Sequence, residues 1–323
     1  MDTRPIIVGV DGSVDSERAL YWAVEAARLR SAPLQVVHIQ PYAASSRAAA
    51  EEEGTGDPVL DALRADAAVQ SLPEVEFRGL SGLTEALLTA LGEEGQLLVL
   101  GSRGRGGFAS LLLGSNGLAC AARAACPVVV VPHPDRGGAR RGTDGAGGAD
   151  GEEAGGLAGG GPAAERAGPQ MTLGVEVPAE EPGAIGFAFA EASRRGAWLK
   201  VVSGYTWPML MPASFEFAAA YETTQQEYED ALGTQLVDAL APHRARHPGV
   251  DVEVQLRNAD AVGQLAEASR ASELLVVARH ARRLPVGRRL GSVAHAVLLH
   301  ALCPVAVVPD VARADGGHPP PIV

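Results

Sequence analysis

The chain has 323 residues, 46% of them hydrophobic, and a formal net charge of −12. This length predicts two domains, and the acidic charge argues against nucleic-acid binding through a basic surface. No apolar run approaches the ~18 residues of a membrane span, and the start lacks a secretion-signal pattern, so we expect a cytoplasmic protein without membrane contact.

The first 133 residues alternate strand and helix patterns. Apolar runs predict strands at 5–10, 33–39, 74–80, 96–100 and 127–132, and amphipathic periods predict helices at 14–30, 57–70, 82–93 and about 112–124. Such alternation predicts an α/β fold with a doubly wound, five-stranded parallel sheet. We expect the flavodoxin-like strand order 3-2-1-4-5, with ligands bound beyond the carboxyl ends of the strands.

A linker separates two similar halves. Residues 134–169 are dominated by Gly, Ala and charge, a composition typical of flexible linkers. Residues 170–310 repeat the first half, because Gly114 matches Gly291 and Cys126 matches Cys303 at one constant offset. We therefore predict a first domain at 1–133, a linker at 134–169, a second domain at 170–310 and a disordered tail at 311–323.

The three cysteines are an odd number and do not suggest a disulfide framework. Cys120 has no His or second Cys at metal-ligand spacing, while Cys126 and Cys303 each precede a proline and a valine-rich run. We expect all three to be small buried hydrophobes, with no metal site.

A glycine-rich loop, GSRGRGGFASLLLGS at 101–115, follows the fourth predicted strand. Gly101 and Gly104 allow positive φ and let backbone N–H groups approach an anion closely. Gly114 and Ser115 begin a helix, whose free N–H groups suit phosphate. The loop is not a P-loop, because Gly107 occupies the lysine position.

Two side chains extend this site. Arg103 is a candidate charged donor to phosphate. Asp11, at the end of the first strand, is placed to accept from an exocyclic amine or a ribose hydroxyl. Together with the loop they predict a nucleotide site. The alternatives are a tight strand–helix connection for the glycines and a solvated charge for Arg103.

The spacing G-x2-G-x9-G-[ST], with VGVDGS at 8–13 and CPVVVVP at 126–132, is similar to the ATP-binding signature of universal stress proteins. The resemblance recurs in the second half, as in a tandem member of this family with adenine nucleotide alpha hydrolase-like domains. It implies ATP as the ligand, with Mg²⁺ as an optional companion. It places adenine and ribose near Gly9, Val10, Asp11, Ile39 and Leu100, and the phosphates near Gly101, Arg103, Gly104, Gly114, Ser115 and Asn116.

Asn116 departs slightly from this family's pattern, in which valine is common, although its backbone N–H would still serve. The second half departs further. Ala278 and Ala281 replace the first two glycines, and Glu176 replaces Asp11. We therefore expect the second site to bind ATP weakly or not at all.

Two further segments of the second half stand out. The arginine cluster at 279–289 is either a retuned anion site or a solvated basic rim. The aromatic loop expected at 205–221 either caps a cavity, packs on a partner or covers the core of its own domain.

The leading hypothesis is an ATP-dependent regulator or sensor in the stress response, with a structural second half. No nucleophile–base set identifies catalytic residues, so at most slow ATP hydrolysis or autophosphorylation is expected. The alternatives are a nucleotide-independent scaffold with an unidentified protein partner and an enzyme of the adenine-nucleotide hydrolase group. Val128–Val131 and Val305–Val308 are expected to be exposed apolar edge strands, which invite pairing. The resemblance implies that they pair, either within one chain as a pseudo-dimer or between chains in a homodimer.

Overall fold

The structure is a computed structural model that describes residues 2–40, 57–104, 113–133, 166, 168–178, 182–207, 215–279, 282–283 and 288–309. At 215–222, 282–283 and 288–289 it describes the backbone alone. The predicted tail and nearly all of the predicted linker lie outside the described residues, so their flexibility is not tested.

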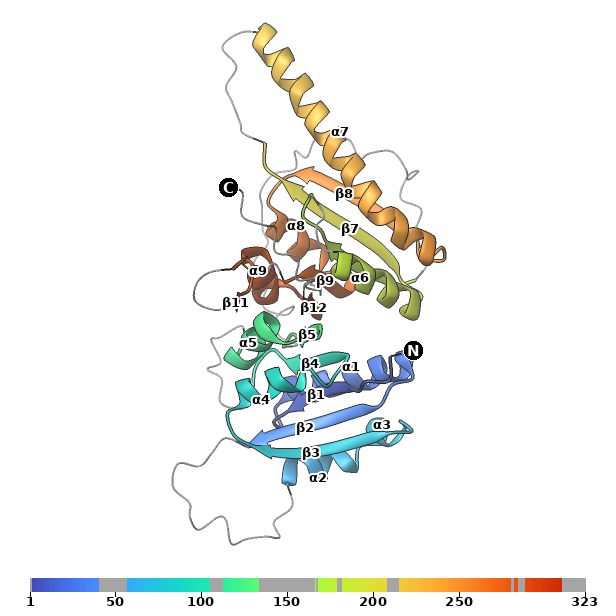
Figure 1. The fold of residues 1–323 in the computed structure, drawn as a ribbon, viewed down its shortest axis with the longest axis vertical. Coiled ribbons are helices and arrows are strands. Elements are labelled where there is room, and N and C mark those ends of the chain that lie inside the picture. Colours follow the sequence, from blue (N-terminus) through green and yellow to red (C-terminus); the bar gives the residue numbers. More distant parts are fainter. Residues whose placement is uncertain are drawn as a thin grey trace, which may run out of the picture.

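Ten strands form one sheet, in the order β3-β2-β1-β4-β5-β12-β9-β6-β7-β8 (Figure 1). The first half supplies β1 (Ile6–Val10), β2 (Leu34–Gln40), β3 (Val75–Ser81), β4 (Leu97–Gly101) and β5 (Val128–Val131). The second half supplies β6 (Gln170–Gly174), β7 (Trp198–Tyr205), β8 (Val252–Asn258), β9 (Ser272–Ala278) and β12 (Val305–Val308). Within each half the strands are parallel and follow the predicted order 3-2-1-4-5.

Helices cover both faces of this sheet, which explains why the strands are almost wholly apolar. One face carries α1 (Val14–Arg30), α2 (Pro58–Arg64), α3 (Ala67–Gln70), α6 (Pro182–Arg195) and α7 (Phe215–Arg246). The other face carries α4 (Thr84–Leu91), α5 (Ser115–Arg123), α8 (Ala261–Ala268) and α9 (Ser292–His300). A short antiparallel pair, β10 (Arg282–Arg283) and β11 (Arg288–Arg289), lies between β9 and α9 in the chain.

Two predicted elements differ from the structure. The helix expected at 57–70 is interrupted, because Asp66 caps a new helix by accepting from the backbone N–H groups of Ala68 and Val69. The aromatic segment expected as a loop is helical from Phe215 onward. The resulting α7 has 32 residues, and its N-terminal end projects past the sheet (Figure 1).

The two halves join through their fifth strands within the chain. β5 and β12 pair antiparallel, with Val130 opposite Val305 and Val128 opposite Val307. Since β4 and β9 occupy their other edges, neither fifth strand has an open edge left for a second chain. A buried carboxylate adds to this contact, because Glu191 of α6 pairs with Arg30 of α1.

Candidate functional site

The ends of β1, β2 and β4 bring the predicted adenine and ribose residues to one edge of the sheet. β1 lies between the other two strands, and parallel strands end at the same edge. Gly9 allows close packing there, since an ideal Cβ on it would lie 2.7 Å from Leu100 Cδ2. Val10, Ile39 and Leu100 are all buried.

Asp11 is held by the turn that enters α1. Its Oδ1 accepts from the backbone N–H of Ser13 at 3.0 Å, and the positive φ of 75° at Gly12 makes the turn tight. Ser13 then caps α1 by accepting from the N–H of Ser16 at 3.2 Å. The carboxylate of Asp11 also faces Gly104, where an ideal Cβ would lie 2.5 Å from Oδ2.

The glycines after β4 are required by close contacts. An ideal Cβ on Gly101 would lie 2.7 Å from the backbone oxygen of Asp15 in α1. Neither Gly101 nor Gly104 has a positive φ, so the structure does not use the left-handed backbone that glycine allows at these positions. Gly101 leaves room for the backbone of α1, whereas Gly104 leaves room for the carboxylate of Asp11, a flexible side-chain end that can rotate away.

Asp15 organises this loop, and sequence reasoning did not single it out. The side chain is buried, and its Oδ2 accepts from Ser102 Oγ at 2.8 Å and from the N–H of Arg103 at 3.0 Å. Arg103 Nε lies 3.7 Å from the same oxygen, and His133 Nε2 lies 3.7 Å from Oδ1. The guanidinium of Arg103 therefore lies beside a protein carboxylate.

The start of α5 has the form that an anion site needs. Gly114 is the N-cap residue and makes no side-chain cap bond, and its own N–H donates to Ser102 O at 2.7 Å. Ser115 and Asn116 follow in the first turn and are exposed. Helix N-termini leave N–H groups for a ligand in this way. Residues 105–112, which include Arg105, lie outside the described residues.

The second half keeps the backbone of this loop but uses it differently. Ser102 N–H donates to Val131 O at 2.8 Å, and Arg279 N–H donates to Val308 O at 2.8 Å. Arg279, at the position of Ser102, is buried, and its Nη1 donates to Ala124 O at the end of α5 at 2.6 Å. The loop of the second half therefore holds the first half. Ala281 lies outside the described residues.

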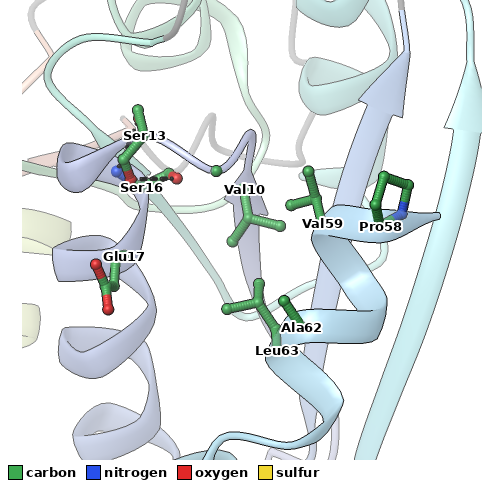
Figure 2. Close-up of a pocket in the computed structure, with 9 residues that line it drawn as sticks. Val10, Ser13, Ser16, Glu17, Pro58, Val59, Ala62 and Leu63 are labelled. Atoms are coloured by element: carbon green, nitrogen blue, oxygen red, sulfur yellow. Dashed lines mark hydrogen bonds between the residues drawn. The ribbon is translucent and has the colours of Figure 1, made fainter.

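A cavity at this edge is lined by residues of β1, α1, α2 and the turn between β1 and α1 (Figure 2). It measures about 330 Å³ and opens between the first turns of α1 and α2. Of the predicted site residues, only Val10 lines it.

His38 forms a structural pair. Its Nδ1 lies 2.7 Å from Oδ2 of Asp57, the N-cap residue of α2. Burial raises the pKa of Asp57, but hydrogen bonds from His38 and from the backbone N–H groups of Leu60 and Val59 outweigh it and hold that pKa below its usual value. The pair joins β2 to α2.

The cysteines are free and buried. Burial raises the thiol pKa of Cys120 and Cys303 to about 12 and that of Cys126 to about 11, which disfavours the reactive thiolate.

Across the described residues, no three His, Cys, Asp or Glu side chains gather as metal ligands. In the same part of the chain, no helix combines the length and apolarity of a membrane span.

Tyr205, Trp207 and Tyr228 pack on one another. The ring centroids of Tyr205 and Tyr228 are 5.9 Å apart, and those of Trp207 and Tyr228 are 5.2 Å apart. For its described part, the aromatic segment thus contacts its own half. The arginines of β10 and β11 pair as Arg282–Arg289 and Arg283–Arg288 along the backbone.

Together, the two halves define a tandem α/β protein with two doubly wound sheets joined edge to edge. The sequence profile of the universal stress protein family matches residues 2–132 and 171–309. The chain belongs to this family and carries its unit twice.

Known relatives have the same extent. A universal stress protein of Mycobacterium tuberculosis strain H37Rv is 30% identical over 322 residues, covering 94% of this chain and 96% of the relative. One from Mycolicibacterium smegmatis is 28% identical over 324 residues, covering 94% and 96%.

Solved structures share the fold. A crystal structure of a protein of unknown function from Pseudomonas aeruginosa PAO1 matches with a TM-score of 0.57 at 16% identity, covering 95% of this chain and 93% of that one. A universal stress protein from Archaeoglobus fulgidus DSM 4304 matches with a TM-score of 0.56 at 13% identity, covering 96% and 99%.

Proposed function

We propose that the first half binds an adenine nucleotide, with ATP as the ligand, and that the protein acts as a nucleotide-dependent regulator in the cytoplasmic stress response. The observation that carries the proposal is the uncapped N-terminus of α5 beside a loop in which Gly101 packs against the backbone of Asp15. Backbone N–H groups of Ser115 and Asn116 hold the phosphates, since a helix N-terminus favours negative charge.

The side chains divide the remaining work. Asp11 and the strand ends at Ile39 and Leu100 hold the base and ribose. Arg103 neutralises phosphate charge when it leaves Asp15. Because the carboxylate of Asp11 faces Gly104, Mg²⁺ accompanies the nucleotide and reduces repulsion between carboxylate and phosphate.

The second half is the structural partner in this proposal. Ala278 places a Cβ where the first half has Gly101, and the Arg279 side chain is committed to the carbonyl oxygen of Ala124. Its site therefore binds ATP weakly or not at all. A protein partner of the regulator is expected to bind the first half in its nucleotide-bound form.

The proposal is tested by mass spectrometry of small molecules released from purified full-length protein, followed by ATP titration with and without Mg²⁺. Gly104→Ala places a Cβ 2.5 Å from Asp11 Oδ2, and we expect ATP binding to weaken about tenfold or more, which is about 1.4 kcal/mol. Gly249→Ala is the matched control, because a Cβ there meets nothing within 4 Å.

If the wild-type protein binds no nucleotide at millimolar ATP, the proposal is wrong. Equal binding by Gly104→Ala and Gly249→Ala would place the nucleotide elsewhere.

A further inference from the structure

The cavity between α1 and α2 is a built pocket with an apolar wall. Pro58, Val59, Ala62 and Leu63 of α2 form that wall, and Val10 closes the inner end (Figure 2). Its volume of about 330 Å³ lies at the lower end of the range for small-molecule sites. It therefore suits a ligand with one ring or one branched aliphatic group.

The corresponding corner of the second half is filled by hydrophobic side chains. This corner lies after the first strand of that half, beside the helix that precedes its third strand. The side chains there form a packed cluster of Tyr205, Leu232 and Leu256 with Val177 and Trp207. Within the described residues, side chains of the second half pack together at this corner.

The charge of the pocket comes from Glu17. Among the described residues that line it, Glu17 alone is ionisable. Its Oε1 lies 3.2 Å from the hydroxyl of Tyr21, which also lies 3.0 Å from Asp66 Oδ2. The entrance is thus acidic, and it favours a cation over an anion.

The other polar groups of the pocket are used by the helix cap. Ser16 Oγ donates to the backbone oxygen of Ser13 at 2.8 Å, and Ser13 Oγ accepts from the N–H of Ser16. The carboxylate of Glu17, whose Oε1 also accepts from the Tyr21 hydroxyl, is therefore the charged group that orients a ligand.

We propose that this pocket binds a small hydrophobic ammonium compound. Its apolar group packs on Val59 and Leu63 of α2, and its ammonium group pairs with Glu17. Among the residues proposed for the nucleotide only Val10 lines the pocket, so this site stands even if the nucleotide proposal fails.

The test compares three probes on full-length protein by calorimetry and protein-observed NMR: 2-phenylethylammonium, 2-phenylethanol and phenylacetate. They share a ring and differ in charge. We expect the cation to bind about tenfold more tightly than the anion, as one ion pair at a partly exposed site allows, with the neutral probe between them. Equal binding of the three, or no binding at millimolar concentration, overturns the proposal.

Two variants with matched controls locate the site. Glu17→Gln removes the preference for the cation, whereas Glu25→Gln, also exposed on α1, leaves it unchanged. Ala62→Phe fills the pocket and abolishes binding, whereas Ala65→Phe, outside it at the C-cap of α2, does not. Both alanines are exposed, so the fold tolerates the larger ring, which circular dichroism verifies. Binding that survives Ala62→Phe places the probe elsewhere and overturns the assignment.

Discussion

Asp15 shows how one buried carboxylate can fix a loop. It lies in the first turn of α1 and accepts from the hydroxyl of Ser102 and the N–H of Arg103. The N-terminus of a helix favours a negative charge, and two donors to Oδ2 offset part of the cost of burial, while Oδ1 has no hydrogen-bond partner among the described residues. The loop after β4 is thereby tied to the helix after β1, and these two segments carry most of the candidate nucleotide site.

Asp15→Ala should destabilise the protein by about 1–3 kcal/mol, because the buried hydroxyl of Ser102 and the partly buried N–H of Arg103 lose their acceptor. Asp15→Asn should recover part of this loss, since its amide oxygen can still accept. Urea unfolding measures both changes. Asp61→Ala, which removes an exposed ion pair with Arg64, is the control and should change stability by less than about 1 kcal/mol. If Asp15→Ala unfolds like the control, the network does not hold the loop.

At this scale, spacing along the chain predicts which glycines matter but not what they meet. Gly101 and Gly104 follow from their position after an apolar strand. The contact of Gly101 with Asp15 depends on how α1 lies against β4, which no local pattern encodes. Asp15 itself has the sequence appearance of an ordinary first-turn acidic residue, and its burial only follows from the packing of two distant segments.

The sequence predicts helices and strands well where apolar residues recur at a regular spacing. It predicts them poorly where a capping hydrogen bond determines where a helix begins. The five strands predicted for the first half and the long helix α1 follow from such patterns. The break before α3 depends on the cap bonds of Asp66, which compete with a continuous helix. The start of α7 at Phe215 lay in an aromatic segment, where bulky side chains gave no clear period.

The packing of α7 on α6 should depend on pH through His243. Its ring is stacked on Phe189, with centroids 5.7 Å apart. Burial, and then the charges of Arg246 and His247, lower the pKa of His243 below its usual value of 6.5. The unfolded chain therefore binds this proton more readily, so stability is full above pH 6.5 and is lost as the pH falls below it.

His243→Leu cannot take up the proton, so its loss of stability between pH 7.5 and 5.5 should be smaller than that of the wild type. Urea unfolding at several pH values measures this slope. His300→Gln, at the exposed end of α9, should keep the wild-type slope. An unchanged slope in His243→Leu would exclude this histidine as the source.

At the scale of the whole molecule, the repeat in the sequence predicts two similar sheets but not how they meet. Pairing through the fifth strands was open between one chain and two. In the structure, β5 and β12 pair within the chain, and the loop that lost its glycines contributes Arg279 to the contact. The same position is Ser102 in the first half, where its hydroxyl donates a hydrogen bond to Asp15. At this position the two loops therefore differ in their contacts, because Ser102 binds Asp15 within its own half and Arg279 binds Ala124 of the other half.

The contact between halves should survive cutting of the chain. With a protease site inserted between residues 134 and 165, the cleaved halves should elute as one species in size-exclusion chromatography, because β5–β12 pairing and the Arg30–Glu191 pair remain.

Arg279→Ser, which installs the residue of the first half, removes a charged donor from Ala124 O. That bond is worth about 1.5–3 kcal/mol, so the cleaved variant should dissociate at a concentration about 10–100-fold higher than the cleaved wild type. The cleaved Arg270→Ser variant, which loses only an exposed pair with Glu267, should match the wild type. Separation of the wild-type halves at micromolar concentration would show that the linker, rather than the paired strands, keeps them together.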